Sequence, residues 1–489
     1  MNTLKRTLAL VATLAMSATA FASCGSKDSS SKDNGTEATT AAKEEATDAA
    51  EPTTAEVVED DTIASDVKTG GDTFTVAAWN HDDVPALIAS WKGLDADTIV
   101  DQLADNKVEG IKFIDFGVGG GQASENYDQL FNDGSDLDVY FVEADWALKY
   151  INDDARTLPL SKLGLGDKDF PNIYGYTDEI GKDSNGVRKG ISWQAAAGGF
   201  AYRADLAKEY LGVETPADMQ KQIGNWSDFV KAAQTVSEKS SKSVALADSL
   251  GGLWQAFACG RTQPWVKDNK LVIDDSCKEF AETAKALWDC NGVTKNSQWT
   301  DEWTAAGVSG NVMGYFVSTW GFGGFFLDAA GGKDGAQYGK WAVCEGPQSF
   351  YWGGTWMVVN PKTDNGDLAR EFIVAATSDE AKMSAYAKSK PEYVNNSKVM
   401  DDLISANTVF NEKISGNFAD KQNYFAELAN NAKSIDFKGL ITPYDSTIKG
   451  NFADAVKENY LEGGKDWDAT VDAFKDKVAE SVPDLEWED

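Results

Sequence analysis

From Asp72 onward, short apolar stretches alternate with stretches of helical periodicity, and this alternation limits the possible folds more than any other feature. Residues 73–78 alternate at period two and predict a first strand that ends at Trp79 and Asn80. Comparable stretches predict strands at residues 110–116, 138–142 and 312–317. Strands that alternate with helices indicate an α/β fold with a mostly parallel sheet, in which ligands sit beyond the strand C-termini.

The chain is too long for a single compact core. It has 489 residues, of which 42% are hydrophobic, which is enough for two cores. Residues 191–203 and 341–359 combine apolar strands with small residues and suit strands that pass between two lobes. We therefore expect two lobes joined by a hinge, the first made of residues 72–197 and 355–405 and the second of residues 198–354 and 406–489.

The N-terminus carries an export signal. Lys5 and Arg6 precede an apolar run that is too short to remain as a membrane span and ends at Ser23-Cys24, in a sequence that resembles a bacterial lipobox. We expect residues 1–23 to be removed and Cys24 to be lipidated. The alternative is ordinary cleavage after residues 18–20, which would release a soluble protein.

Residues 24–70 contain almost no large apolar side chain and predict a disordered acidic tether. A tether behind a lipid anchor places the folded part at the outer face of the cytoplasmic membrane, with the lipid as the sole membrane contact.

The charge balance excludes several classes of partner. A formal net charge of −33 would repel nucleic acid and anionic membrane surfaces, so a neutral or cationic ligand is favoured. Zinc is not expected, because the cysteines after Cys24 form no CxxC pair and the chain has 1 histidine. The spacing leaves open whether these cysteines form disulfides or are free buried thiols: Cys259, Cys277, Cys290 and Cys344.

Four segments, in this order, resemble the extracellular solute-binding proteins of family 1, whose carbohydrate-specific members serve ABC importers. They are residues 134–141, 190–206, 225–229 and 351–356. The resemblance implies a type II periplasmic-binding-protein fold, with two α/β lobes joined by a hinge and the ligand cleft between them. It also implies ABC permease subunits as partners and no catalysis. We further expect a monomer without a cofactor.

The candidate ligand site follows from the chemistry of a sugar, whose apolar faces stack on aromatic rings while its hydroxyls bond to carboxylates and amides. The chain has 16 tryptophans, several of them at predicted strand ends. The candidate residues at strand ends, in the return strand and in the second lobe are Trp79, Asn80, Glu143, Asp145, Trp146, Trp193, Gln194, Trp254, Gln255, Trp320, Tyr351, Trp352, Gly353 and Gly354. The family resemblance assigns the strand-end aromatic to Trp320 and adds a late aromatic, Tyr444.

A mono- or oligosaccharide is the favoured ligand, but three alternatives stay open. A secreted glycoside hydrolase would also use tryptophans and paired carboxylates. Aromatic residues beside acidic ones also bind quaternary ammonium compounds. A surface lipoprotein that senses or adheres would need no transporter.

Overall fold

The structure is a computed structural model, and it describes residues 61–322, 325–390, 392–407, 415–436 and 440–487. The predicted signal peptide, Cys24 and most of the predicted tether lie outside these residues. The elements described below belong to one unit, residues 60–489. Within the described part of the chain, no helix is both long enough and apolar enough to cross a bilayer.

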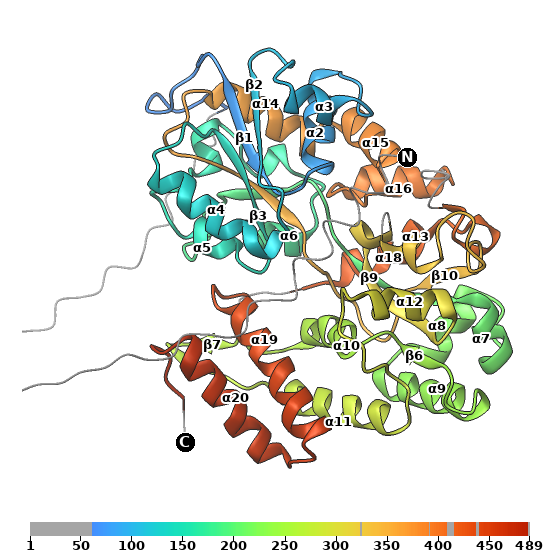
Figure 1. The fold of residues 1–489 in the computed structure, drawn as a ribbon. Helices are drawn as coiled ribbons and strands as arrows, with labels where there is room; N and C mark the ends of the chain where they lie inside the picture. The colour runs from blue at the N-terminus through green and yellow to red at the C-terminus, as the bar shows by residue number, and fades with distance from the viewer. Residues whose placement is uncertain (1–60, 323–324, 391, 408–414, 437–439, 488–489) are drawn as a thin grey trace, which may run out of the picture. The chain divides into compact units, whose positions relative to one another are not determined.

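The first lobe is built on a five-stranded sheet with the order β2-β1-β3-β11-β4 (Figure 1). β1 pairs in parallel with β2 and β3, whereas β11 runs antiparallel to β3 and β4. Both faces of the sheet are buried, so its central strands are almost entirely apolar. The strands are β1 (Phe74–Ala78), β2 (Ile111–Asp115), β3 (Val139–Glu143), β4 (Gly190–Ser192) and β11 (Thr355–Val359).

Helices cover both faces of this sheet. On one face, the Phe74 ring lies 5.3 Å from Trp91 and 6.1 Å from Phe372. On the other face, the Tyr140 ring lies 5.2 Å from Tyr127 and 5.9 Å from Tyr150. The helices of this lobe are α2 (Asp83–Lys92), α3 (Ile99–Ala104), α4 (Gly120–Asn132), α5 (Ala147–Ile151), α6 (Gly175–Ile180), α14 (Gly366–Thr377), α15 (Glu380–Ser389) and α16 (Ser397–Ser405).

The second lobe is built on a four-stranded sheet with the order β10-β5-β9-β6. β5 pairs antiparallel with β10 and β9, and β6 and β9 are parallel. The prediction of a mostly parallel sheet rests on residues 73–78, 110–116 and 138–142, which belong to the first lobe. In the second lobe β5, which leads away from the first lobe, runs antiparallel to both of its neighbours. The strands are β5 (Gly198–Arg203), β6 (Ala245–Ala247), β9 (Val312–Ser318) and β10 (Trp341–Cys344), with a separate pair β7 (Val266–Lys267) and β8 (Lys270–Leu271).

The helices of the second lobe pack on both faces of this sheet: one core includes Phe200, Phe229 and Phe316, and the core on the other face includes Trp303, Tyr315 and Trp341. They are α7 (Ala204–Leu211), α8 (Pro216–Ile223), α9 (Trp226–Lys239), α10 (Leu250–Phe257), α11 (Asp275–Asp289), α12 (Asp301–Ser309), α13 (Phe325–Ala329), α18 (Tyr424–Ser434), α19 (Asp445–Ala455), a π-helical continuation of α19 (Val456–Glu462) and α20 (Trp467–Ser481).

Two crossing segments, residues 193–197 and 345–354, lie side by side between the sheets. Gly198 donates its backbone N–H to the Phe350 carbonyl at 2.8 Å, and Trp352 donates to the Ala196 carbonyl at 3.1 Å. A side chain at Gly198 would collide with the Phe350 ring, which would lie 2.1 Å from its Cβ. The strands that link the lobes are therefore closely packed.

Residues 61–70 differ from the expected tether, because they lie against the first lobe. Ala64 donates to the Lys162 carbonyl at 2.8 Å, and Gly366 donates to the Lys68 carbonyl at 2.9 Å. Val67 packs against the core of this lobe. Ion pairs of Asp66 with Lys162 and of Asp61 with Lys168 add to these contacts, so the folded part begins about ten residues before the position inferred from composition.

All four cysteines in the described residues are free thiols: Cys259, Cys277, Cys290 and Cys344. Burial raises the pKa of the Cys259 thiol to about 11 and that of Cys277 to about 12. At neutral pH both therefore stay in the thiol form.

Candidate ligand-binding site

The carboxyl ends of β1 and β3 bring together two predicted tryptophans in the first lobe. Trp79 follows β1 and Trp146 follows β3, and their ring centroids lie 5.5 Å apart. The Trp146 indole donates from Nε1 to the Gly120 carbonyl at 3.2 Å, at the start of α4. Both rings are partly exposed. These contacts make them a fixed aromatic pair at the edge where the parallel strands end.

Asn80 follows this pair directly and is also partly exposed. Its side-chain oxygen is buried and accepts no hydrogen bond from the described residues. A buried acceptor without a partner is uncommon in folded proteins. Asn80 thus has a side-chain acceptor that the described residues leave unused.

The crossing segment at residues 345–354 contacts both the end of β3 and a second group of indoles. The Trp320 indole donates from Nε1 to the Trp352 carbonyl at 2.7 Å, and the two rings lie 5.4 Å apart, edge to face. Gly353 lies between the lobes: a Cβ there would be 3.5 Å from Oε1 of Glu143 and 3.5 Å from Nε1 of Trp320. Gly354 accepts a hydrogen bond from the Ala144 backbone at 3.1 Å. The predicted residues from β3, β9 and the return strand therefore meet at one place, which we call the lobe junction.

Trp299 belongs to the same group, although the sequence did not predict it. Its ring stacks on Trp320 at 5.7 Å with an interplanar angle of 28°, and lies 5.4 Å from Trp352 and 5.0 Å from Trp303. We call Trp299, Trp303, Trp320 and Trp352 the tryptophan cluster. Trp299 stands just before α12, so the strand-end pattern does not predict it.

An ion pair crosses between the lobes at the junction. Nζ of Lys449, on α19, lies 2.9 and 3.0 Å from the two carboxylate oxygens of Asp145, after β3. Lys449 also donates to the side-chain oxygen of Gln255 at 3.3 Å, and Gln255 donates from Nε2 to the Tyr351 carbonyl at 3.1 Å. Burial acts against the lysine charge, but Asp145 and Glu143 raise the pKa of Lys449 above its ordinary value. In the sequence, Lys449 stands in a polar stretch without a motif, so the sequence did not indicate its role.

The Glu143 carboxyl lies at the end of β3, beside Asp145. Burial raises the pKa of the Glu143 carboxyl, and the nearby Asp145 charge raises it further. Its Oε2 accepts a hydrogen bond from the Asp145 backbone at 2.9 Å. A carboxyl with a raised pKa can donate as well as accept, which suits a hydroxyl ligand.

Three predicted residues lie away from the tryptophans of the junction. Trp193 is fully buried in the core, with its ring 5.5 Å from Phe141. Trp254 is buried in the second core between Phe280 and Phe452, each within 4.8 Å. Tyr444, immediately before α19, is 38% exposed. Trp193 follows β4 as Trp79 follows β1, but the core covers its ring, whereas Trp254 lies within α10 and faces the second core.

Gln194 is part of a buried polar network where the crossing segments meet. It donates from Nε2 to the Glu392 carboxyl at 2.9 Å, and Thr319 donates its hydroxyl to the same carboxyl at 2.6 Å. Burial raises the pKa of Glu392 to about 8. The network ties a residue after β4 to one after β9, so it connects the two sheets.

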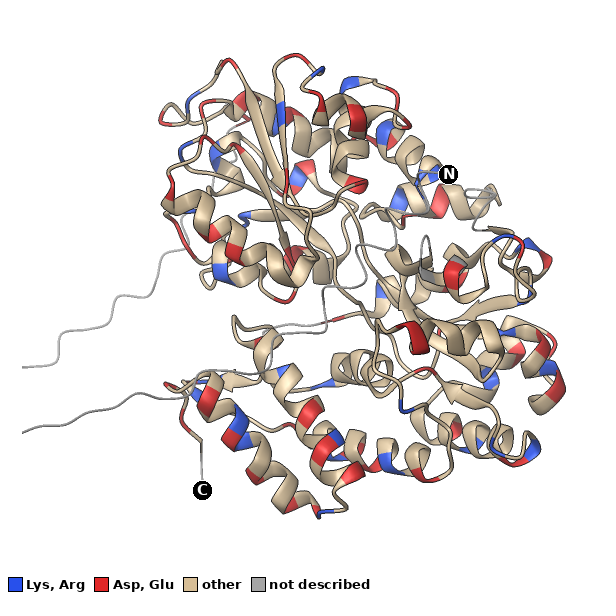
Figure 2. Cartoon of the chain, in the orientation of Figure 1, with Lys and Arg blue, Asp and Glu red and all other residues tan. Residues whose placement is uncertain are grey.

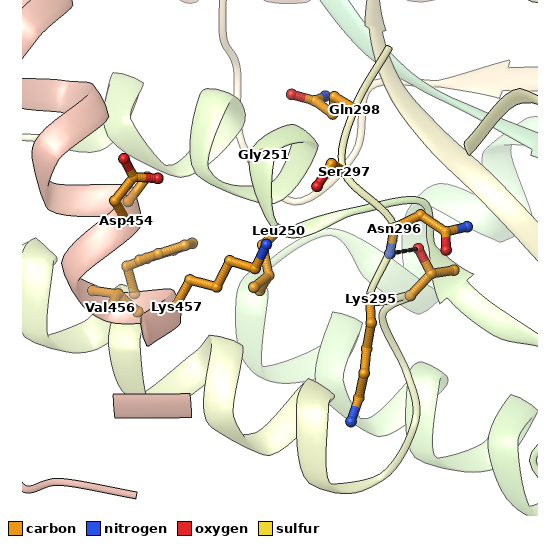
Figure 3. Close-up of a pocket in the computed structure, with 12 residues that line it drawn as sticks. Leu250, Gly251, Lys295, Asn296, Ser297, Gln298, Asp454, Val456 and Lys457 are labelled. Carbon is orange, nitrogen blue, oxygen red and sulfur yellow. Dashed lines mark hydrogen bonds between the residues drawn. The ribbon is translucent and has the colours of Figure 1, made fainter. Parts of the chain in front are cut away.

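A separate cavity of about 170 Å³ lies within the second lobe (Figure 3). It is lined by the start of α10 at Leu250 and Gly251, by the loop from Thr294 to Gln298, and by Asp454 and Lys457 near the end of α19. The predicted site residues are not among its lining residues. This cavity is therefore distinct from the lobe junction.

The protein has two α/β lobes, each with its own sheet, and crossing strands join them. Aromatic and carboxyl side chains lie where the lobes meet. This arrangement is typical of two-lobed binding proteins. A family model of the bacterial extracellular solute-binding proteins matches residues 104–383, more than half of the chain. The chain belongs to this family. Members of the family are extracellular binding proteins, so the location is extracytoplasmic.

Solved structures share this fold over most of the chain. A crystal structure of an extracellular solute-binding protein of family 1 has a TM-score of 0.67 and 17% identity, covering 85% of this chain and 100% of its own. The ABC transporter associated binding protein of B. animalis subsp. lactis, in complex with β-1,6-galactobiose, has a TM-score of 0.61 and 17% identity, covering 86% of this chain and 100% of its own. The galacto-N-biose/lacto-N-biose I-binding protein of Bifidobacterium longum, in complex with lacto-N-biose, has a TM-score of 0.61 and 16% identity, with coverage of 86% and 100%. Comparison with curated protein sequences gave no match.

Proposed function

We propose that this protein binds a neutral sugar at the lobe junction and delivers it to the permease of an ABC importer. The observation that carries the proposal is the meeting, around Gly353, of the Glu143 carboxyl from the first lobe and the Trp320 indole from the second. Aromatic surfaces on both lobes supply stacking faces, and closure of the lobes buries the ligand between them.

The charges at the junction favour a neutral ligand over a cation. Asp145 is already paired with Lys449, and Glu143 has a raised pKa, so little uncompensated negative charge is left for a quaternary ammonium group. Acidic residues are spread over both lobes (Figure 2), which disfavours an anionic ligand. Hydroxyl groups suit the remaining donors and acceptors, among them the unpartnered oxygen of Asn80.

The comparisons support a sugar by analogy. Two of the structures that share this fold are described as complexes with β-1,6-galactobiose and with lacto-N-biose. At 17% and 16% identity these likenesses support the fold, and the sugar specificity of this chain rests on the junction chemistry.

Isothermal titration calorimetry with a panel of mono- and oligosaccharides, betaine and choline tests the proposal. We expect at least one saccharide to bind and to be recovered uncleaved. If betaine or choline binds and no saccharide does, the ligand is a quaternary ammonium compound and not a sugar. Shortened saccharides in the recovered solution would identify a glycoside hydrolase.

Substitutions in the junction test the site itself. Trp146→Ala and Trp352→Ala should each weaken binding of the identified saccharide by roughly 1–4 kcal/mol, because each removes an aromatic face. Trp467→Ala is the matched control, since that partly buried indole packs on Phe452 in the second core. Equal affinities of both junction variants and the control would reject the site.

We also propose that Cys24 is lipidated and that the acidic segment behind it works as a tether. The lipobox-like sequence around Cys24 and the apolar run before it support this proposal. In the native host the wild-type protein should partition into the detergent phase of Triton X-114, whereas Cys24→Ala should not. Wild-type protein in the aqueous phase would contradict lipidation.

A further inference from the structure

Trp299 combines exposure with an unfavourable backbone conformation. It is 39% exposed, which is high for an indole that also contacts three other rings. Its φ is +67°, in the left-handed region that bulky residues rarely adopt. Such strain persists where the surrounding structure holds it, and it is concentrated at binding sites.

The loop that carries Trp299 is held from its C-terminal side. Thr300 is the N-cap of α12: its hydroxyl oxygen accepts a hydrogen bond from the Trp303 backbone at 3.3 Å. The same hydroxyl donates to the Ser297 carbonyl at 2.9 Å. These bonds fix the turn around Trp299, so the indole stays on Trp320 instead of moving with a free loop.

Trp299 extends the aromatic surface outward from the lobe junction. Trp320 lies next to the junction, because its Nε1 is close to Gly353. Trp299 is stacked on Trp320 and is the most exposed of the four rings in the tryptophan cluster. A single sugar ring seated at Glu143 and Trp320 would have no need of this outer indole.

We propose that Trp299 forms an outer subsite that stacks on a further sugar ring, so that the ligand is an oligosaccharide and not a monosaccharide. This inference rests on the proposed sugar-binding function. The inner ring binds at the junction, where the Glu143 carboxyl and the Trp320 and Trp352 indoles lie. The next ring of the chain leaves the junction along Trp320 and stacks on Trp299.

The test compares Trp299→Asn with wild type across a ladder of saccharide lengths. Asparagine tolerates the left-handed conformation, so this substitution removes the ring without adding backbone strain. The probes are β-linked galacto-oligosaccharides and α-linked gluco-oligosaccharides of one to four rings, titrated by calorimetry. We expect wild-type affinity to rise with chain length. Trp299→Asn should lower affinity roughly tenfold for the longer sugars and leave the shortest binding sugar unchanged.

Trp299→Phe should recover part of the lost affinity, because a smaller aromatic face remains. An equal loss of affinity at every saccharide length would mean that Trp299 supports the inner site. Wild-type affinity at every length would mean that Trp299 does not touch the ligand. Either result overturns the inference but leaves sugar binding intact. If wild type binds none of the saccharides, the proposed function itself falls, and the inference falls with it.

Discussion

Glu392 provides a quantitative test of how the hinge is built. Its carboxyl is 5% exposed and accepts hydrogen bonds from Thr319, Gln194 and the Tyr393 backbone. Burial raises its pKa from 4.5 to about 8, so the folded protein holds a neutral carboxylic acid here at pH 7. Glu392→Gln replaces that acid by a neutral amide of the same shape, which can keep the same acceptor oxygen for Thr319 and Tyr393.

The sign of the pH effect follows from the direction of this pKa change. The folded state binds the Glu392 proton more tightly than the unfolded chain does, so the free energy of unfolding falls as the pH rises between 4.5 and about 8. Each pH unit within this window is worth about 1.4 kcal/mol. Between pH 5 and pH 8 wild type should therefore lose about 3.5 kcal/mol relative to Glu392→Gln.

The assay is urea denaturation followed by tryptophan fluorescence at pH 5, 6, 7 and 8 for both proteins. The exposed Glu109→Gln variant is the control for removing one acidic charge from an acidic chain. We expect the stability difference between Glu392→Gln and wild type to grow steadily with pH in favour of the amide. Parallel curves, or a strong loss of stability of Glu392→Gln at pH 5, would refute the neutral buried acid.

Three further substitutions test other contacts. Lys449→Met leaves the partly buried Asp145 carboxylate unpaired and should lower the free energy of unfolding by about 1–2 kcal/mol. The control Lys398→Met, at an exposed ion pair, should lower it by less than about 0.5 kcal/mol. Equal effects in urea melts would contradict a structural ion pair between the lobes. Gly353→Ala adds a side chain at φ +66° and should cost about 1 kcal/mol, whereas Gly450→Ala, within α19, should be neutral or stabilising in the same melts. Asp138→Ala removes the acceptor of the Thr75 backbone N–H and the Thr363 hydroxyl and should cost about 2–4 kcal/mol by thermal denaturation; a change below about 0.5 kcal/mol would contradict this role.

Local patterns were enough to predict most of the elements. The period-two stretch at residues 73–78 became β1, and the apolar stretch at residues 312–317 became β9. These predictions succeeded because a strand that is buried on both faces has a short, nearly continuous apolar sequence.

The strand-end rule identified part of the candidate site. Trp79, Trp146, Trp320 and Trp352 are brought to partly exposed positions, and Glu143 follows as a neighbour in the chain. Trp79 and Trp146 could be found because they follow β1 and β3, and the carboxyl ends of these parallel strands meet at one edge. Trp320 follows β9 of the other sheet, and Trp352 precedes β11, so the packing of the lobes brings these two to the junction.

The sequence alone determined an exported, strongly acidic chain with two α/β lobes, and it pointed to strand-end indoles as binding groups. Only the tertiary structure decided which indoles are covered, as Trp193 is by the core, and which residues from distant parts of the chain join them. Lys449 reaches Asp145 across 304 positions, and Trp299 stacks on Trp320 from a loop before a helix. The physical reason is that a sequence pattern reports the burial of one element against its neighbours, whereas contacts between distant elements are set by how all of them pack together.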